Sequence, residues 1–153
     1  MSFTHRYESP LGTITLKSDG SAITGLCFAA PTSPDTPLPV FDEASRWLDL
    51  YFAGQQPDFL PPLAPRGTAF QLAVWHALSR IPYGQTTTYA GLAAQLGLSR
   101  AHARAIGAAV ARNPILLLFP CHRVLAASGA PSGYAAGPER KAALLSSERR
   151  SFS

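Results

Sequence analysis

The sequence contains no long apolar run. A membrane-spanning helix needs about 20 consecutive apolar residues, whereas even Ile115 to Phe119, an apolar run bounded by Pro114 and Pro120, is only of strand length. Met1 to Arg6 also lack the apolar stretch of a secretory signal peptide. These absences predict a protein without a membrane partner, located in the cytoplasm and, in a bacterium, associated with the nucleoid. A nuclear location stays open.

Cysteine is scarce as well. Cys27 and Cys121 are the only two, and neither has a second cysteine or a paired histidine at the spacing of zinc ligands. His122 adjoins Cys121, but neighbours in sequence rarely bind one ion together. Two cysteines are also too few for a disulfide scaffold. We therefore expect no structural metal, no disulfide framework and no small-molecule cofactor.

Acidic residues are rare in the second half of the chain. Residues 80–153 carry nine basic side chains against two acidic ones, whereas residues 1–79 carry four basic side chains against seven acidic ones. A basic C-terminal half suits the phosphate backbone of DNA. The same bias also occurs on basic surfaces that bind no nucleic acid. Charge alone leaves both interpretations open.

The first third of the chain is patterned as short strands. Residues 12–17 alternate in side-chain character, Asp19-Gly20-Ser21 is typical of a turn, and residues 22–28 predict a second strand. A later segment predicts a helix over residues 41–52, because its apolar residues share one face: Phe41, Trp47, Leu48, Tyr51 and Phe52. We interpret the proline cluster in residues 57–65 as a linker, so that residues 1–65 form an N-terminal lobe.

Residues 66–153 are predicted to form a mostly helical second lobe. A first helix ends at Pro82-Tyr83-Gly84 and has four apolar residues at helical spacing: Phe70, Val74, Leu78 and Ile81. Thr88 can cap a second helix, residues 89–96, and Ser99 can cap a third, which runs to Arg112. A helix, a short turn and a longer helix form the helix-turn-helix pattern.

The third predicted helix has two different faces. The face expected to pack on the core carries Ile106, Ala103 and Val110. The opposite face carries arginine and alanine: Arg100, Arg104, Ala108 and Ala111. Small residues around arginine let a helix backbone approach a DNA groove closely. A solvated face made of good helix formers has the same composition.

Cys121 has the surroundings of a reactive thiol. It follows the strand predicted for residues 115–119, lies at the break made by Pro120, and precedes His122, which can polarise it directly or through a water. Glu148 is the better placed of the two acids in this half to orient the imidazole. We expect Cys121 to be nucleophilic and partly exposed. Cys27, on an amphipathic strand, is assigned to the core.

The surroundings of Cys121 resemble the signature of the O6-alkylguanine-DNA alkyltransferases. The likeness begins in Arg104-Ala105-Ile106-Gly107, continues through Asn113-Pro114 and culminates in Pro120-Cys121-His122-Arg123-Val124. Downstream it includes, at the family's spacings, Ser128-Gly129, Gly133-Tyr134, Gly137, Lys141, Leu144-Leu145 and Glu148. Upstream it reaches Pro82-Tyr83-Gly84 and residues 89–93, and more weakly Ser9-Pro10-Leu11-Gly12. The clear part of the resemblance covers residues 66–148.

The resemblance implies an α+β fold in two lobes. The N-terminal lobe would hold a small antiparallel, ribonuclease-H-like sheet with a helix, and the C-terminal lobe a winged helix-turn-helix that carries the active site. The implied activity is that of a methylated-DNA–protein-cysteine methyltransferase, which repairs DNA by direct reversal. The alkyl group of O6-alkylguanine, and also of O4-alkylthymine, would pass irreversibly to Cys121 in a single turnover. We expect a monomer whose partner is double-stranded DNA.

The resemblance also implies roles for individual residues. Cys121 would accept the alkyl group after activation by His122 through a bridging water, with Glu148 holding the imidazole and Asn113 bracing the turn. Arg104 would enter the minor groove and fill the gap left by the flipped nucleotide. The residues implied to bind or line the flipped base are Tyr89, Val124, Tyr134, Ala135 and Lys141. Further DNA contacts are implied for Arg100, Ala101, Thr88 and Arg112.

The chain departs from the family's pattern beside Tyr134. The family commonly has Tyr-Ser-Gly-Gly where this chain has Tyr134-Ala135-Ala136-Gly137. The group implied to donate to the guanine O6 there is a backbone N–H, which alanine keeps. Two added methyl groups would narrow the pocket. We therefore predict weaker acceptance of bulky adducts such as benzyl.

Three other functions fit part of the pattern. A non-catalytic alkylated-DNA-binding or lesion-recognition protein would share the scaffold, but alkyltransferase-like proteins have tryptophan at the position of Cys121. A helix-turn-helix regulator should show a dimerisation element and a base-reading helix. A cysteine hydrolase normally takes its histidine from elsewhere in the sequence. The non-catalytic DNA binder is the main alternative to alkyl transfer.

Overall fold

The computed structural model describes residues 2–128 and 134–150 and divides into two compact units. The first comprises Met1–Arg66 with Pro114–Leu116, and the second Gly67–Asn113 with Leu117–Ser153. Together they give the α+β fold expected from the sequence. No helix in the described part of the chain is long and apolar enough to cross a membrane.

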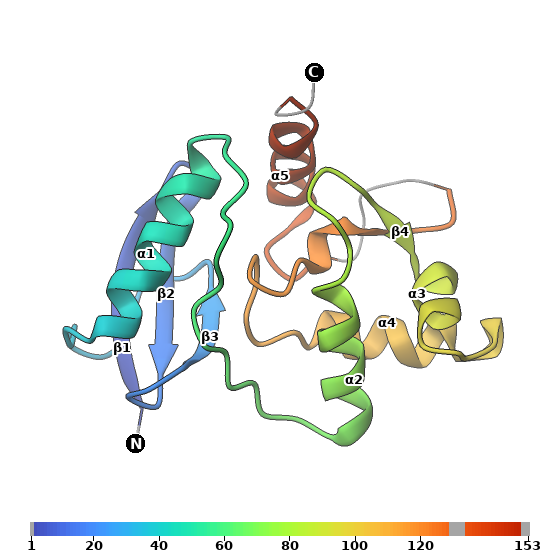
Figure 1. Ribbon diagram of the computed structural model, residues 1–153, viewed down its shortest axis with the longest axis horizontal. Coiled ribbons are helices and arrows are strands. Elements are labelled where there is room, and N and C mark those ends of the chain that lie inside the picture. The colour runs from blue at the N-terminus through green and yellow to red at the C-terminus, as the bar shows by residue number, and fades with distance from the viewer. Residues whose placement is uncertain (1, 129–133, 151–153) are drawn as a thin grey trace. The chain divides into compact units, whose positions relative to one another are not determined.

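The first unit contains an antiparallel sheet of three strands in the order β1-β2-β3 (Figure 1). The strands are β1 (Phe3–Ser9), β2 (Gly12–Ser18) and β3 (Ile23–Cys27). The two strands predicted over residues 12–17 and 22–28 are therefore confirmed. Cys27 is half-buried rather than part of the core, because it occupies the last position of β3.

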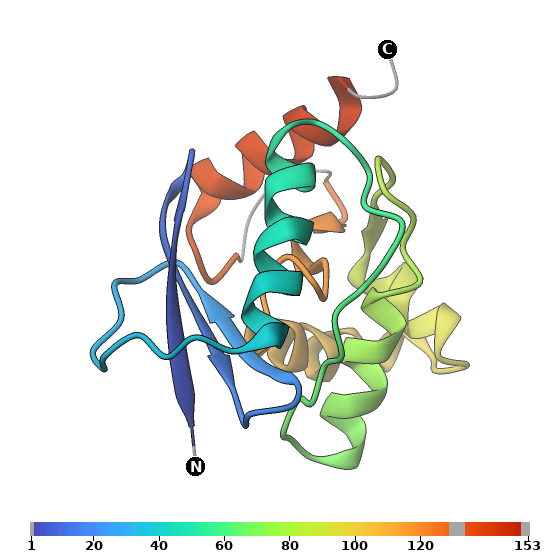
Figure 2. The ribbon, with the colours of Figure 1, turned by 60° about the vertical axis from the view of Figure 1, so that its left-hand side comes forward.

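Helix α1 (Pro39–Phe52) lies along one face of this sheet (Figures 1 and 2). It starts two residues before the predicted position, because Pro39 fits the first turn, where a missing N–H costs nothing. Its apolar stripe is buried except for the half-buried Phe52, and the rings of Trp47 and Tyr51 stack with centroids 5.2 Å apart. This helix covers the apolar core of the first unit.

The proline segment interpreted as a linker is part of the first unit. The N–H of Ile23 donates to the carbonyl of Pro62 at 2.8 Å, and the N–H of Ala64 donates to the carbonyl of Ile23 at 2.8 Å. Proline lacks an N–H but keeps its carbonyl, so this segment still pairs along the edge of β3. The segment that we interpreted as a linker therefore pairs with β3 at Pro62 and Ala64 and lies within the first unit.

The strand predicted over residues 115–119 does not form. Ile115 makes an isolated parallel bridge with Leu26, and the N–H of Leu116 donates to the carbonyl of Leu26. Leu117 then has φ of 71°, in the left-handed region that breaks an extended run. The apolar run is buried in full, but as a turn rather than as a strand.

The second unit begins with α2 (Ala69–Leu78), which carries a capping box made by Thr68 and Gln71. The helix ends three residues earlier than predicted. Val74, Leu78 and Ile81 are buried as expected, but Phe70 is 37% exposed. Its predicted core position was wrong, because residues 66–70 are all exposed and the first turn of α2 lies in solvent.

A helix-turn-helix follows in the same unit. It consists of α3 (Tyr89–Gln95), a 3₁₀ turn η1 (Arg100–His102) and α4 (Ala103–Ala111). The third predicted helix was expected to follow a cap at Ser99, but the α-helix proper starts at Ala103. Ser99 makes no capping bond, because its hydroxyl lies 3.3 Å from Nδ1 of His102 instead.

Two short elements connect the helix-turn-helix to the Cys121 segment. Strand β4 (Thr87–Thr88) pairs in parallel with β5 (Val124–Leu125), which directly follows the 3₁₀ turn η2 (Cys121–Arg123). The chain ends in α5 (Pro138–Arg150), whose buried side includes Lys141 and Glu148. Residues 129–133, which include Gly129 and Gly133 of the resemblance, lie outside the described residues.

Candidate active site

Cys121 opens η2 and is nearly buried. Cys121 is only 4% exposed. The partly exposed thiol expected from the sequence was therefore wrong. The turn places the sulfur near Asn113, Lys141 and Tyr134 rather than in solvent, so that a thiolate formed there would interact electrostatically with both Lys141 and Tyr134. The candidate nucleophile therefore lies inside the second unit and meets DNA only if a base is brought to it.

Asn113 connects the end of α4 to the Cys121 turn. Its side-chain amide donates to the carbonyl of Phe119 at 2.8 Å, and it also hydrogen-bonds the Cys121 side chain. Asn113 is itself 7% exposed. Both contacts act on the turn from within the protein, so the backbone leading into Cys121 is held in one conformation.

Burial governs the protonation of Cys121. Loss of hydration raises the pKa of the thiol to about 11, while the hydrogen bond from Asn113 and the charge of Lys141 act in the opposite direction. At neutral pH the resting site therefore holds a thiol, not a thiolate. Such a group needs a base at the moment of reaction.

His122 is a base placed beside this thiol and held by Glu148. Its Nε2 lies 2.5 Å from Oε2 of Glu148, and the two side chains are 0% and 1% exposed. Burial lowers the pKa of His122, although Glu148 pulls in the opposite direction. The imidazole is therefore neutral at rest, and a neutral imidazole can accept a proton.

Glu148 stays ionised despite its burial. Burial alone would raise the pKa of the carboxyl, but hydrogen bonds and charge from His122 and Arg123 lower it to about 2. Gly84 contributes a further donor, since its N–H lies 3.2 Å from Oε1. The carboxylate can thus orient the imidazole without taking its proton.

Arg123 is a site residue for which the sequence predicts no role. Its Nε donates to Oε1 of Glu148 at 2.8 Å, and its Nη1 donates to the carbonyl of Ile81 at 2.8 Å. The available signal was its place directly after Cys121-His122, but its partners depend on the packing of α5, which no local pattern reveals.

Lys141, on α5, lies close enough to Cys121 and His122 to interact with both electrostatically. It is 1% exposed, and its Nζ donates to the carbonyl of Val124 at 2.6 Å. Burial lowers the pKa of Lys141, and the charge of Cys121 opposes this shift. Val124 is one of the residues that the resemblance implies to bind the flipped base, and its carbonyl thus already accepts one hydrogen bond. A carbonyl oxygen has two lone pairs, so it can accept a second one.

Two tyrosines approach the site, Tyr134 from the segment before α5 and Tyr89 from α3. Tyr134 is 8% exposed, its ring centroid lies 6.4 Å from that of His122, and no described residue hydrogen-bonds its buried hydroxyl. Tyr89, on α3, is half-buried, and burial and the charge of Cys121 raise its pKa. Ala135, the next residue after Tyr134, is exposed.

The residues predicted to contact DNA lie on the helix-turn-helix. Arg100, Ala101, Arg104 and Arg112 are all exposed. Of the face predicted to pack on the core, Ile106 and Val110 are buried as expected, whereas Ala103 is only half-buried because it opens α4. The opposite face is confirmed, since Arg100, Arg104, Ala108 and Ala111 are exposed. Thr88 is half-buried, and its hydroxyl caps α3 by accepting from the N–H of Gly91 at 3.0 Å.

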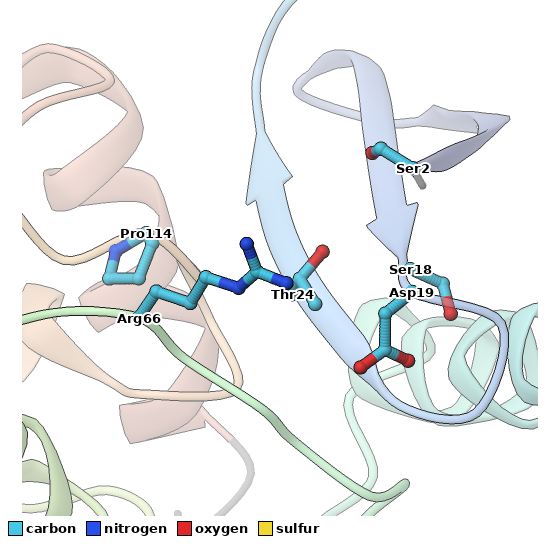
Figure 3. A pocket seen from close by; sticks show the side chains of 6 residues that line it. All are labelled: Ser2, Ser18, Asp19, Thr24, Arg66 and Pro114. Atoms are coloured by element: carbon cyan, nitrogen blue, oxygen red, sulfur yellow. The ribbon is translucent and has the colours of Figure 1, made fainter.

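A separate depression of about 500 Å³ lies in the first unit (Figure 3). It is lined by Ser2, Ser18, Asp19, Thr24, Arg66 and Pro114. Its polar groups serve the turn after β2: the Ser18 hydroxyl donates to the carbonyl of Ala22, and Asp19 accepts from two backbone N–H groups. Nothing in this lining resembles a reactive centre.

Fold and site together define a class: a helix-turn-helix protein whose second unit holds a buried cysteine beside a histidine–carboxylate pair. Known families agree with this class. A family model for the 6-O-methylguanine DNA methyltransferase DNA binding domain matches residues 69–150, and the model for the ribonuclease-like domain of the same enzymes matches residues 3–65.

Individual relatives cover almost the whole chain. A Methanosarcina acetivorans protein named methylated-DNA–protein-cysteine methyltransferase is 44% identical over 149 residues, which are 93% of this chain and 95% of the relative. A Mycobacterium tuberculosis protein of the same name is 45% identical, covering 93% of this chain and 89% of the relative. The crystal structure of Mycobacterium tuberculosis OGT in complex with DNA superposes with a TM-score of 0.88 at 43% identity, covering 97% and 94% of the two chains.

The chain belongs to the 6-O-methylguanine DNA methyltransferase family. The resemblance found in the sequence is thereby confirmed, as is the ribonuclease-like character of the N-terminal lobe. The roles of individual site residues remain predictions.

Proposed function

We propose that this protein repairs alkylated DNA by direct reversal, with Cys121 accepting the alkyl group from O6 of guanine. The observation that carries the proposal is the placement of Cys121 next to the His122–Glu148 pair, with Nε2 and Oε2 2.5 Å apart, in the same unit as the helix-turn-helix. Family membership supports both the DNA partner and the enzyme class, a DNA methyltransferase with a cysteine acceptor.

The chemistry begins with proton transfer. When the alkylated base arrives, Cys121 gives its proton to the neutral imidazole of His122, directly or through a water, and becomes a strong nucleophile. The sulfur then attacks the alkyl carbon. An S–C bond forms and the C–O6 bond breaks with its electrons on the guanine. The guanine takes up a proton at N1 and the imidazolium of His122 gives one up, so that the net proton transfer is from the Cys121 thiol to the guanine.

The product explains why the protein should act once. The alkylated Cys121 is a thioether, from which the cysteine thiolate is a poor leaving group, and no described residue of the site supplies an agent that would remove the alkyl carbon. Repair is therefore stoichiometric, with one protein molecule spent for each lesion. The same chemistry applies to O4-alkylthymine, which presents an alkyl ether at the corresponding edge of the base.

Access to a thiol that is 4% exposed requires that the nucleotide leave the DNA stack. We propose that α4 binds the minor groove, where exposed Arg104 fills the gap left by the flipped nucleotide. Arg100, Ala101, Thr88 and Arg112 would contact the DNA around it. The protein would bind its duplex as a monomer and, in a bacterium, act in the cytoplasm at the nucleoid.

The flipped base would then lie against the groups around Cys121. Tyr134 offers a buried hydroxyl with no partner among the described residues, so a base edge would satisfy it. Tyr89 would contact the base from α3. The Cys121 and Val124 carbonyls would accept from the guanine amino group, the backbone N–H of Ala135 would donate to O6, and Lys141 would support the site through Val124.

Mass spectrometry after mixing the protein with an O6-methylguanine duplex tests the proposal. We expect one added methyl on the peptide that contains Cys121 and none on the peptide that contains Cys27. Cys27→Ser should still take up the methyl group, and Cys121→Ser should not. DNA binding without any adduct on Cys121 would instead indicate a lesion-recognition protein and refute the proposal.

A further inference from the structure

The side chain of Arg123 is fixed between two parts of the second unit. Its Nε and Nη2 donate to Oε1 and Oε2 of Glu148 at 2.8 and 3.3 Å, and its Nη1 donates to the carbonyl of Ile81 at 2.8 Å. The guanidinium also lies 5.6 Å from the ring centroid of Tyr83. Arg123 is 8% exposed. A planar fork held at three positions and shielded from water has one orientation.

Glu148 is consequently surrounded by donors. His122 approaches Oε2, Arg123 approaches both oxygens, and the N–H of Gly84 approaches Oε1. A carboxylate with several donors and an adjacent cation strongly favours its ionised form. The proton between His122 and Glu148 therefore belongs to Nε2. In a neutral imidazole the other nitrogen, Nδ1, is then the acceptor.

We infer that Arg123 is a positioning residue of the transfer reaction: it fixes and neutralises Glu148, so that Glu148 orients His122 without charging it. This inference rests on the proposed function, in which His122 must be able to take the Cys121 proton. A lone buried carboxylate next to an imidazole would stabilise the imidazolium and leave no base. The guanidinium offsets that attraction.

The other groups around His122 fit this balance. Helix α5 contributes Glu148 and Lys141 to its surroundings, and the segment before α5 contributes Tyr134. Its sequence neighbours in η2 are Cys121 and Arg123. The carboxylate favours the imidazolium, and the charges of Arg123 and Lys141 oppose it. Removing Arg123 deletes one of the two opposing cations, so His122 should become protonated at higher pH than in the wild type.

The experiment measures single-turnover methyl transfer from an O6-methylguanine duplex between about pH 5 and about pH 9, the range in which histidine titrates. For Arg123→Met we expect the acidic limb of the rate profile to shift to higher pH by about one unit. At a given pH on that limb, the rate should then be roughly tenfold lower than in the wild type. At the alkaline end the loss should be smaller. Arg123→Lys keeps the charge and should show a smaller displacement.

Arg149→Met is the matched control, because Arg149 is an exposed arginine directly after Glu148 on α5. It should leave the pH profile unchanged. A merely structural role of Arg123 would lower the rate equally at every pH, and that outcome overturns the inference. If Arg123→Met does not fold, Arg123→Gln takes its place, and an acidic limb at the wild-type pH in that variant would overturn the inference, because the charge of Arg123 would then be dispensable.

A second measurement separates this inference from the proposed function. NMR titration of the His122 imidazole in protein without DNA reports its protonation in the absence of any methyl transfer. We expect its titration midpoint to be higher in Arg123→Met than in the wild type. If the wild type transfers no methyl group but this difference is present, the proposed function fails and the role of Arg123 stands. An unchanged midpoint overturns the role of Arg123.

Discussion

Oε2 of Glu148 lies at hydrogen-bonding distance from Nε2 of His122, 2.5 Å, although the two residues are 26 positions apart in the chain. Both side chains are buried, and Arg123 completes the cluster by binding the same carboxylate. A buried charge without its partner is costly, so this cluster connects the chemistry of the site to the stability of the second unit.

Replacing Glu148 by glutamine tests that connection. The variant leaves the charge of Arg123 buried without its counter-ion, and we expect a loss of ~3–5 kcal/mol in the free energy of unfolding at neutral pH. Glu139→Gln, at an exposed position of the same helix, should change stability little. Urea unfolding measures both. Equal stability of the two variants would contradict the prediction.

The same cluster predicts how wild-type stability depends on pH. The pKa of Glu148 is lowered from 4.5 to about 2 in the folded protein, so its contribution is present above pH 4.5 and is lost as the pH falls toward 2. The pKa of His122 is lowered from 6.5, so its contribution begins to be lost below pH 6.5. Urea midpoints should therefore fall continuously on acidification, and the part below pH 4.5 should be weaker in Glu148→Gln.

General thiol reagents should prefer the cysteine that we do not assign to the reaction. Burial raises the pKa of Cys121 to about 11 and leaves it 4% exposed, whereas Cys27 is half-buried. Because the thiolate is the reacting form, iodoacetamide at neutral pH should label Cys27 first, and labelling of Cys121 should accelerate as the pH approaches 11. Peptide mass spectrometry distinguishes the two sites. Preferential labelling of Cys121 at neutral pH would mean that the resting site holds a thiolate.

Gly91 should not tolerate alanine. A Cβ atom at this position would clash with Oγ1 of Thr87 and would lie 3.3 Å from Oγ1 of Thr88, the residue that caps α3. We expect Gly91→Ala to lower stability by ~1–3 kcal/mol, the usual cost of overpacking. Gly107→Ala is the comparison, since its Cβ would meet the Tyr89 ring at an ordinary 3.7 Å. Thermal unfolding of both variants measures the difference, and equal melting temperatures would contradict it.

The predictable part of this protein is local in sequence. Cys121 and His122 are neighbours, and the spacing of Ile106 and Val110 is enough to assign the buried face of α4. The strands over residues 12–17 and 22–28 follow from alternation and one turn. In each case the relevant contact lies within a few residues, so a single pattern carries the information.

The parts that were wrong depend on contacts between distant segments. Nothing near Ile115 indicates that the chain pairs with Leu26 and then turns at Leu117. The carbonyl of Pro62 pairs with Ile23 although proline argues against a strand. Arg123 finds Glu148 only because α5 packs beside η2. Burial of Cys121 has the same origin, since the groups that enclose it come from several elements.

Ala135 and Ala136 provide the prediction that concerns substrate range. Tyr134, the preceding residue, is buried beside His122, while Ala135 is exposed and Ala136 is half-buried. The carbonyl of Ala136 also accepts from Arg140 at 3.1 Å, which holds this segment against α5. The added methyl groups therefore lie on a restrained segment at the edge of the proposed base pocket.

We expect this protein to repair O6-benzylguanine more slowly, relative to O6-methylguanine, than a variant with Ala135→Ser and Ala136→Gly does. Single-turnover rates with both lesions in the same duplex measure this ratio. Because the backbone donor is kept in both proteins, the methyl rate should change little. An unchanged benzyl-to-methyl ratio would show that the two methyl groups do not narrow the pocket.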